Sequence, residues 1–506
     1  MPQTKILLST INARYFHASL GLRYLLANMA ELEADTALFE FTLEQRPIDI
    51  AEELLAHQPE IIGISIYIWN IEQSSQLIAL IKAISPETNI VIGGPEVSYE
   101  WQGVPVVEMA DYLICGAADL AFAALCRTIL NGDRPHDKVI QAAPLALEDL
   151  ALPYPYFTDT DIANRIIYVE ASRGCPFKCE FCLSALDKSC VHFNIDDFLE
   201  AMAQLYQRGV RHFKFTDRTF NLNIDSSCAV LDFFLQRLDD SLFLHFEVIP
   251  DHLPDALKAR ISCFPSGTLQ LEIGIQSFNP EVQQLISRKQ NNQRSAESLR
   301  WLREASHAHL HADLIIGLPG EDMTSFGQGF DQLVTLNPHE IQVGILKRLK
   351  GAPVARHDGL FQMCYNPMPP YNLLCNNHIN FITMQRLNRF ARYWEMIANS
   401  GRFKQSMPLI LAQSPFQNFM RLSDWLFETT GQTHKISLNR LIRLLYRGMT
   451  ELLKLDDELT LQALHKDFKK VDYPSFKTMM ASEPVKDKSS HKSSLANRQA
   501  QHQLHP

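Results

Sequence analysis

The chain has 506 residues, a formal net charge of −10 at pH 7, 46% hydrophobic residues and 21% charged residues. This length is too great for one hydrophobic core, so we expect two to four domains. The acidic balance without a long basic run argues against a nucleic-acid partner, and no apolar run reaches the roughly eighteen residues of a membrane span. The N-terminal apolar stretch is too short for a signal peptide and is interpreted as a first strand, which predicts a cytoplasmic globular protein.

Residues 1–134 alternate between strand and helix patterns. The predicted strands cover residues 5–10, 37–42, 60–69, 89–93 and 111–115, and the predicted helices cover residues 20–29, 72–84 and 120–130. The isoleucine-rich stretch at 60–69 is typical of a strand buried on both faces. This order predicts an α/β, Rossmann-like domain with a doubly wound parallel sheet, whose ligand binds beyond the carboxyl ends of the strands.

Residues 135–164 are predicted to be a linker, because residues 135–157 hold four prolines and show no clear period. From residue 165 to about 360 the alternation resumes. Strands are predicted at 166–171, 212–216, 242–248, 269–276, 310–317 and 340–346, and helices at 196–207, 227–238, 254–262, 294–305 and 323–336. Six strands with intervening helices predict a partial (β/α)6 barrel, whose active site would lie at the carboxyl rim of the strands.

After residue 360 the strand signals fade. Helical patterns at 378–398, 415–429 and 438–455 predict a helical C-terminal domain over residues 361–481. Residues 482–506 are polar and poor in hydrophobic residues, so we expect a disordered tail.

Three cysteines follow the first predicted barrel strand, within the stretch ASRGCPFKCEFCLS. Cys175, Cys179 and Cys182 lie within eight residues, so their sulfurs can converge only on a compact group. A cubane iron–sulfur cluster fits, because three thiolates bind three irons and leave the fourth iron open. The alternative is structural zinc with Cys190 or His192 as a fourth ligand, while a disulfide is disfavoured in the cytoplasm. The other seven cysteines are interpreted mainly as small buried hydrophobic residues.

The CxxxCxxC spacing, with an aromatic residue before the last cysteine, resembles the radical S-adenosylmethionine (SAM) superfamily. LEIGIQSF at 271–278 and DLIIGLPGE at 313–321 resemble the fourth- and fifth-strand segments of that family, and the resemblance covers about residues 165–350. It implies that the open iron chelates SAM, and that one electron, from a donor such as flavodoxin or ferredoxin, cleaves SAM to a 5′-deoxyadenosyl radical. The expected SAM-binding residues are Glu272, Gln276 and Asp217. For Glu272, pairing with a basic neighbour inside the barrel is the alternative.

The first domain resembles the cobalamin-binding domain of cobalamin-dependent radical SAM enzymes. The resemblance lies in GIS at 63–65 and IGGPE at 92–96, and it implies that Ser65, Gly93 and Gly94 approach the cofactor. The DxHxxG motif of many cobalamin proteins is absent, so His17 is interpreted as an ordinary loop or helix-start residue. Radical methylthiotransferases have a similar domain order, but their N-terminal domain carries a second cluster, for which Cys115 and Cys126 are too few.

The sequence therefore predicts a cobalamin-dependent radical SAM enzyme that modifies, and is expected to methylate, an unactivated carbon of a small-molecule substrate. NARYFHASLGLRYL, FTDRTFN and ILKRLKGAP resemble local signatures of a subgroup of these enzymes that has a helical C-terminal domain of unassigned role. Three alternatives stay open at this point: a cluster- or corrinoid-binding redox sensor without turnover, a radical SAM cyclase or rearrangement enzyme, and a zinc-stabilised interaction protein. No catalytic residue and no substrate can be named from the sequence.

Overall fold

A computed structural model describes residues 4–187, 189–468 and 472–481. The described residues form two compact units, which divide between Ala391 and Arg392. No helix in the described part of the chain is long and apolar enough to cross a membrane. The predicted disordered tail at 482–506 lies outside the described residues, and the predicted domain boundaries stay predictions.

The first unit begins with a sheet of six parallel strands in the order β2-β1-β3-β4-β5-β6. Every residue of β1 is buried, as expected for a central strand covered on both faces. The strands are β1 (Ile6–Asn12), β2 (Thr36–Thr42), β3 (Ile61–Ser65), β4 (Asn89–Gly93), β5 (Tyr112–Cys115) and β6 (Val139–Gln141). The doubly wound sheet predicted from the sequence is therefore present.

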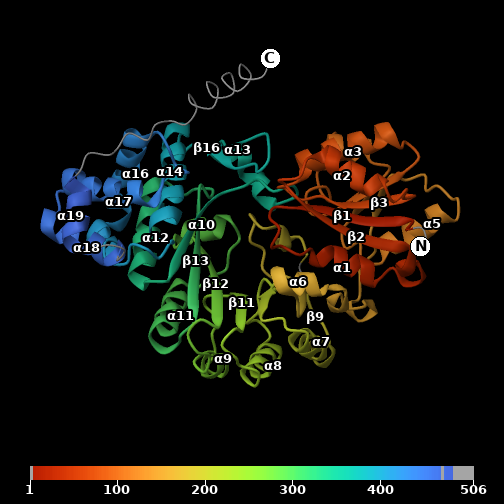
Figure 1. Cartoon of the computed structure of the whole chain (residues 1–506), viewed down its shortest axis with the longest axis horizontal. Coiled ribbons are helices and arrows are strands. Elements are labelled where there is room, and N and C mark those ends of the chain that lie inside the picture. Colours follow the sequence, from red (N-terminus) through yellow and green to blue (C-terminus); the bar gives the residue numbers. More distant parts are fainter. Residues whose placement is uncertain (1–3, 188, 469–471, 482–506) are drawn as a thin grey trace, which may run out of the picture. The chain divides into compact units, whose positions relative to one another are not determined.

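Helices cover both faces of this sheet (Figure 1). Apolar residues of α2, α3 and α4 form one core with it, and apolar residues of α1 and α5 form a second core on the opposite face. The helices are α1 (Leu20–Ala27), α2 (Pro47–Leu55), α3 (Ile71–Ile84), α4 (Pro105–Met109) and α5 (Ala121–Leu130), and the 3₁₀ turn η1 (Ala30–Asp35) follows α1. The two cores confirm a layered α/β arrangement.

The segment predicted to be a linker contains regular structure. Strand β6 extends the first sheet by pairing with β5, and two 3₁₀ turns follow, η2 (Leu147–Asp149) and η3 (Tyr154–Tyr156). Helix α6 (Asp159–Asn164) begins with a capping box between Thr158 and Asp161. A strand of three residues between prolines shows too few alternations to be predicted from sequence.

The second sheet also consists of six parallel strands, in the order β14-β13-β12-β11-β10-β7. The order follows the chain, which is the topology of a partial barrel. The strands are β7 (Ile167–Val169), β10 (His212–Phe215), β11 (Phe243–Val248), β12 (Leu269–Gln276), β13 (His309–Ile316) and β14 (Glu340–Ile345). The helices are α7 (Ile195–Gln207), α8 (Ile224–Leu235), α9 (Asp255–Ile261), α10 (Pro280–Leu285), α11 (Asn292–Ala305) and α12 (Met323–Leu336).

Short elements complete the barrel and lead to the helical part of the chain. The two-stranded sheets are β8 (Ser172–Gly174) with β9 (Cys190–His192), and β15 (Cys364–Tyr365) with β16 (Leu373–Cys375). Helical turns are η4 (Leu183–Ala185), η5 (Pro353–His357) and α13 (Asp358–Phe361). The later helices are α14 (Phe381–Ile397), α15 (Met407–Leu411), α16 (Pro415–Thr430), α17 (Leu438–Arg447), α18 (Asp457–Phe468) and α19 (Tyr473–Ala481). The helix predicted at 438–455 changes to a π-turn, η6 (Gly448–Leu452), after α17.

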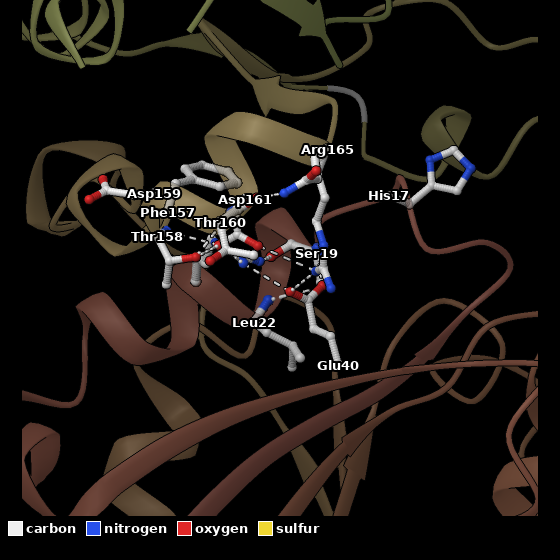
Figure 2. Close-up of polar contacts among 12 residues, drawn as sticks. His17, Ser19, Leu22, Glu40, Phe157, Thr158, Asp159, Thr160, Asp161 and Arg165 are labelled. Carbon is white, nitrogen blue, oxygen red and sulfur yellow. Dashed lines mark hydrogen bonds and ion pairs between the residues drawn. The ribbon is translucent and has the colours of Figure 1, made fainter. Parts of the chain in front are cut away.

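A buried ion network joins the first sheet to the start of the barrel (Figure 2). The Arg23 guanidinium on α1 lies 2.9 Å from a Glu40 carboxylate oxygen on β2 and 2.8 Å from an Asp161 oxygen on α6. Arg165, just before β7, lies 2.7 Å from the same Glu40 oxygen. These side chains are nearly inaccessible to water, so each charge depends on its partners.

Candidate active site

The cysteine loop begins directly after β8, at the carboxyl rim of the barrel. Cys175, Cys179 and Cys182 all line one cavity of about 250 Å³, together with residues from β11, β12 and β13. Gly174 precedes the loop with φ of +88°, and a Cβ added there would lie 2.0 Å from the Ser189 carbonyl oxygen. Only glycine therefore lets the chain enter the loop at this point. The structure brings the three predicted cysteines together around one cavity.

Glu180, between two of the cysteines, fixes the loop to more distant segments. Its buried carboxylate accepts hydrogen bonds from Ser287 and Arg356 and lies 3.0 Å from the His357 Nε2 atom. The Glu180 backbone adds two further bonds, because its N–H donates to Ile286 and its carbonyl accepts from the Val354 N–H. This role could not be predicted from the sequence, because all partners of Glu180 lie more than a hundred residues away along the chain.

Arg288 brings a positive charge to the cysteine loop. Its guanidinium donates to the Cys179 sulfur at 3.4 Å and to the Gly274 carbonyl oxygen on β12. Burial raises the pKa of the Cys179 thiol, and the Arg288 charge opposes this shift by favouring the thiolate. Arg288 can therefore stabilise negative charge on this sulfur and on an anionic ligand in the cavity.

The interior of the barrel is unusually polar for a closed core, which is commonly filled by branched apolar residues. Alternate residues of β12 are buried against the helices, so Glu272 and Gln276 lie on the inner face. Glu272 lines the cavity, and its carboxylate lies 2.9 Å from His245 Nε2 and 3.8 Å from the Lys214 amino group. The hydrogen bond with His245 lowers the pKa of Glu272 to about 2. The carboxylate is therefore ionised and already paired with basic neighbours, as the alternative interpretation expected.

Gln276 and Asp313 line the same cavity. Gln276 Oε1 is buried without a hydrogen-bond partner among the described residues, whereas Asp313 Oδ1 forms an ion pair with His311 Nε2. Burial raises the pKa of Asp313, and His311 lies 3.4 Å from its carboxylate. Buried polar atoms without partners are uncommon and indicate that a ligand supplies the missing bond.

Asp217 does not line this cavity. Its buried carboxylate accepts hydrogen bonds from the Ala171 backbone N–H at 3.0 Å and from the Ser172 hydroxyl at 2.5 Å. Burial raises the pKa of Asp217 to about 7. The neighbouring Arg218 does line the cavity and pairs with Glu247 at 2.8 Å. Asp217 therefore supports the strand that leads to the cysteine loop, and its contact with SAM stays a prediction.

Ser65, Gly93 and Gly94 converge at the carboxyl ends of β3 and β4. They line a small recess of about 50 Å³ together with apolar residues of β3, β4, β5 and α5. Gly94 has φ of +108°, and a Cβ added there would lie 2.5 Å from the Ile66 carbonyl oxygen. Because the backbone at residue 94 lies against the backbone of Ile66, a side chain at residue 94 would have no room beside the recess.

His17 lies in the loop between β1 and α1, and its backbone pairs with Ile166 next to β7. Its Nδ1 atom lies 2.6 Å from the Tyr168 hydroxyl, and burial lowers its pKa. His17 thus connects the first βα loop to the first barrel strand.

The seven scattered cysteines do not share one environment. Cys115 and Cys126 are buried as predicted, whereas Cys263 and Cys364 are exposed and Cys190, Cys228 and Cys375 are partly buried. The interpretation as buried hydrophobic residues is therefore wrong for most of them. Among the residues that the structure describes, no group of three or more His, Cys, Asp or Glu side chains could hold a single metal ion.

Comparison with known families places two domain types on this chain. The family model of the B12 binding domain matches residues 6–126, and that of the radical SAM superfamily matches residues 169–332. The chain carries a radical SAM domain over residues 169–332. This radical SAM protein also matches a family of unknown function, DUF4080, over residues 360–505. The combination confirms the family resemblance that the cysteine spacing and strand motifs carry.

Relatives of this radical SAM protein include methyltransferases. An uncharacterised methyltransferase of Pyrococcus horikoshii is 24% identical over 332 residues, which cover 60% of this chain and 70% of the relative. A cobalamin-dependent radical SAM methyltransferase, TokK of Streptomyces tokunonensis, is 23% identical and is covered over 50% of its length. The solved structure of the cobalamin-dependent radical enzyme OxsB, with aqua-cobalamin and SAM bound, superimposes with a TM-score of 0.62 at 12% identity. That match covers 95% of this chain and 84% of the OxsB chain. This likeness shows the same fold.

Proposed function

We propose that this radical SAM protein is a cobalamin-dependent enzyme that transfers a methyl group to an unactivated carbon of a small molecule. The observation that carries the proposal is the set of three cysteines around a polar cavity in the same compact unit as a B12-binding domain; the same cavity is lined by Gln276, whose buried Oε1 atom lacks a hydrogen-bond partner. The methyltransferase relatives support the reaction type.

Two groups of residues would hold the cluster and the corrinoid. Cys175, Cys179 and Cys182 would bind a [4Fe–4S] cluster, because three thiols spread around a cavity suit a polynuclear cluster with one open iron. The recess at Ser65, Gly93 and Gly94 would hold part of the corrinoid, since its glycines leave room for close approach to the backbone. When bound, the cluster supplies the electron that cleaves SAM, and the corrinoid carries the methyl group.

The chain's own residues would bind and orient the reactants. Gln276 Oε1 can accept a hydrogen bond from an ammonium group, and the Arg288 guanidinium can bind a carboxylate, so the two match the amino-acid end of SAM. The ion pair between Arg218 and Glu247 and the half-buried carboxyl group of Asp313 line the cavity with ionisable groups of both signs. A polar small molecule with its own charged groups is the substrate class that these residues fit.

We further propose a flavodoxin or ferredoxin as the electron donor, because the chemistry needs single electrons at low potential. The need for low-potential electrons and the presence of ten free cysteines both favour the reducing cytoplasm as the location of this protein.

The test is anaerobic reconstitution with iron, sulfide and cobalamin, followed by addition of SAM and reductant. We expect 5′-deoxyadenosine, S-adenosylhomocysteine and a methyl group labelled from SAM on the substrate. In a variant with all three cysteines changed to alanine, we expect cobalamin binding but no iron and no cleavage of SAM. If the reconstituted protein neither binds nor cleaves SAM, the proposal fails, and deoxyadenosine without any methylated product would favour the cyclase or rearrangement alternative.

A further inference from the structure

Two cysteines outside the candidate active site face each other across a small hairpin. Cys364 on β15 and Cys375 on β16 are direct partners in the antiparallel register. Residues directly opposite in such a pair have Cα atoms about 4.5–5.5 Å apart. A disulfide needs a Cα separation of about 4.4–6.8 Å. The hairpin therefore already holds the two cysteines at a spacing that a disulfide can bridge.

The two thiols differ in their access to solvent. Cys364 is exposed, whereas Cys375 is partly buried. Burial and the neighbouring Cys364 raise the pKa of Cys375. An exposed thiol next to a more protected one is the arrangement of an attacking and a resolving cysteine.

The hairpin contacts both halves of the first compact unit. The Leu373 N–H donates to the Leu346 carbonyl oxygen, next to β14, at 2.8 Å. A Cβ added to Gly317, in the GLPGE segment, would lie 2.4 Å from a Leu373 methyl carbon, so this side chain packs directly on the barrel. On the other side, the Tyr371 hydroxyl donates to Glu96 at 2.7 Å, two residues beyond Gly94. Strand β16 and the turn before it thus lie between the barrel rim and the loop that follows β4.

We propose that Cys364 and Cys375 form a reversible dithiol–disulfide pair that low-molecular-weight disulfides such as glutathione disulfide oxidise. The Cys364 thiolate attacks one sulfur of glutathione disulfide, which forms a mixed disulfide and releases one glutathione. The Cys375 thiolate then attacks the Cys364 sulfur, which forms the Cys364–Cys375 bond and releases the second glutathione. Two protein thiols are oxidised and one glutathione disulfide is reduced to two glutathiones, which take up the two protons.

Oxidation would tie the two strands of the hairpin together at their open end. Because β16 carries Leu373 and follows Tyr371, the disulfide would restrict opening of the segment that contacts Gly317 and Glu96. The proposal does not depend on the reaction at the cysteine loop, since neither Cys364 nor Cys375 lines that cavity.

The test uses the full-length, cluster-loaded protein, incubated anaerobically with glutathione disulfide, alkylated and digested. Residues 357–386 form one tryptic peptide that contains both cysteines and no internal lysine or arginine. We expect this peptide to lose two hydrogens and to escape alkylation, and dithiothreitol to reverse both changes. In Cys375→Ser we expect Cys364 to stop as a mixed disulfide with glutathione, and in Cys364→Ser we expect Cys375 to react several-fold more slowly.

Cys263 provides the internal control, because it is exposed and its sulfur donates a hydrogen bond to the Ala259 carbonyl oxygen. We expect Cys263 to carry glutathione without forming an intramolecular bond. We also expect hydrogen exchange over residues 364–375 to slow in the oxidised protein. The proposal is wrong if Cys364 and Cys375 each end as a mixed disulfide with glutathione. It is also wrong if both remain free thiols that are alkylated while Cys263 has reacted with glutathione disulfide.

Discussion

Gly94 is a single residue on which the first candidate binding recess depends. Its φ of +108° lies in the region that favours glycine, and an added Cβ would lie 2.5 Å from the Ile66 carbonyl oxygen. We predict that Gly94→Ala lowers the unfolding free energy by about 1–3 kcal/mol and reduces cobalamin affinity at least tenfold. Thermal unfolding and spectrophotometric titration with cobalamin measure the two effects.

Gly103 is the matched control for this substitution. It also has positive φ, at +71°, but an added Cβ would meet no atom within 4 Å. We expect Gly103→Ala to keep cobalamin affinity within about twofold, because only backbone strain is introduced. Equal loss of cobalamin binding in both variants would show that the recess is not the binding site.

Asp217 gives a prediction for pH dependence. Burial raises its pKa to about 7, above the value of about 3.9 for an unfolded aspartate. When the pKa of a carboxyl group is higher in the folded state than in the unfolded state, its protonated form stabilises the folded protein. This contribution is complete at pH values below the unfolded-state pKa, and it is lost as the pH rises to about 7. Part of the stability of the cofactor-free protein should therefore decline between about pH 4 and pH 7.

Asp217→Asn should lower stability by about 1–2 kcal/mol, because one amide oxygen replaces two accepting oxygens, but it should flatten part of this decline. Urea unfolding at several pH values in this window measures the slope. Burial also raises the pKa of Glu321 to about 7, so part of the decline of stability with pH should remain in the variant. An unchanged slope would contradict the assignment to Asp217.

At the scale of elements, the cysteine loop shows how far the sequence could be followed. The spacing of Cys175, Cys179 and Cys182 after a strand predicted their shared position at the barrel rim. The residues that hold the loop, among them Glu180 and Arg288, could not be predicted, because their contacts form only when distant segments fold together. Regular strands such as β4 and β12 were predicted to the residue, whereas β6 was missed because three residues carry no period.

Glu180 provides the element-scale test. We expect Glu180→Gln to reconstitute with less iron, or to lose iron to a chelator several-fold faster, because the neutral amide loses the charge that binds Arg356 and His357. Iron and sulfide analysis against time in chelator measures this. Glu297→Gln, an exposed substitution on α11, should behave as the unsubstituted protein. Equal iron retention in both variants would mean that the contacts of the Glu180 carboxylate do not hold the cysteine loop.

At the scale of the whole molecule, the first compact unit combines two parallel sheets through a small number of buried charges. Arg23 compensates Glu40 and Asp161, which come from segments more than a hundred residues apart. This pairing could not be predicted from the sequence, since charges on α1, β2 and α6 show no local pattern.

Arg23→Met should therefore lower the unfolding free energy by about 3–5 kcal/mol, because it leaves two buried carboxylates with fewer partners. Arg46→Met is the control, because Arg46 and Asp49 form an exposed pair on the surface, where removal should change the unfolding free energy little. Chemical denaturation of both variants makes the comparison. Similar small losses in both would show that the buried network does not hold the two sheets together.

The central claim is that three cysteines hold a cluster whose open iron binds SAM. The most direct measurement is electron–nuclear double resonance on the anaerobically reduced protein, with SAM labelled with ¹⁵N at its amino group. The claim predicts a ¹⁵N coupling to the cluster that is present in the unsubstituted protein and absent without SAM. An intact reduced cluster with SAM bound to the protein and no such coupling would contradict it.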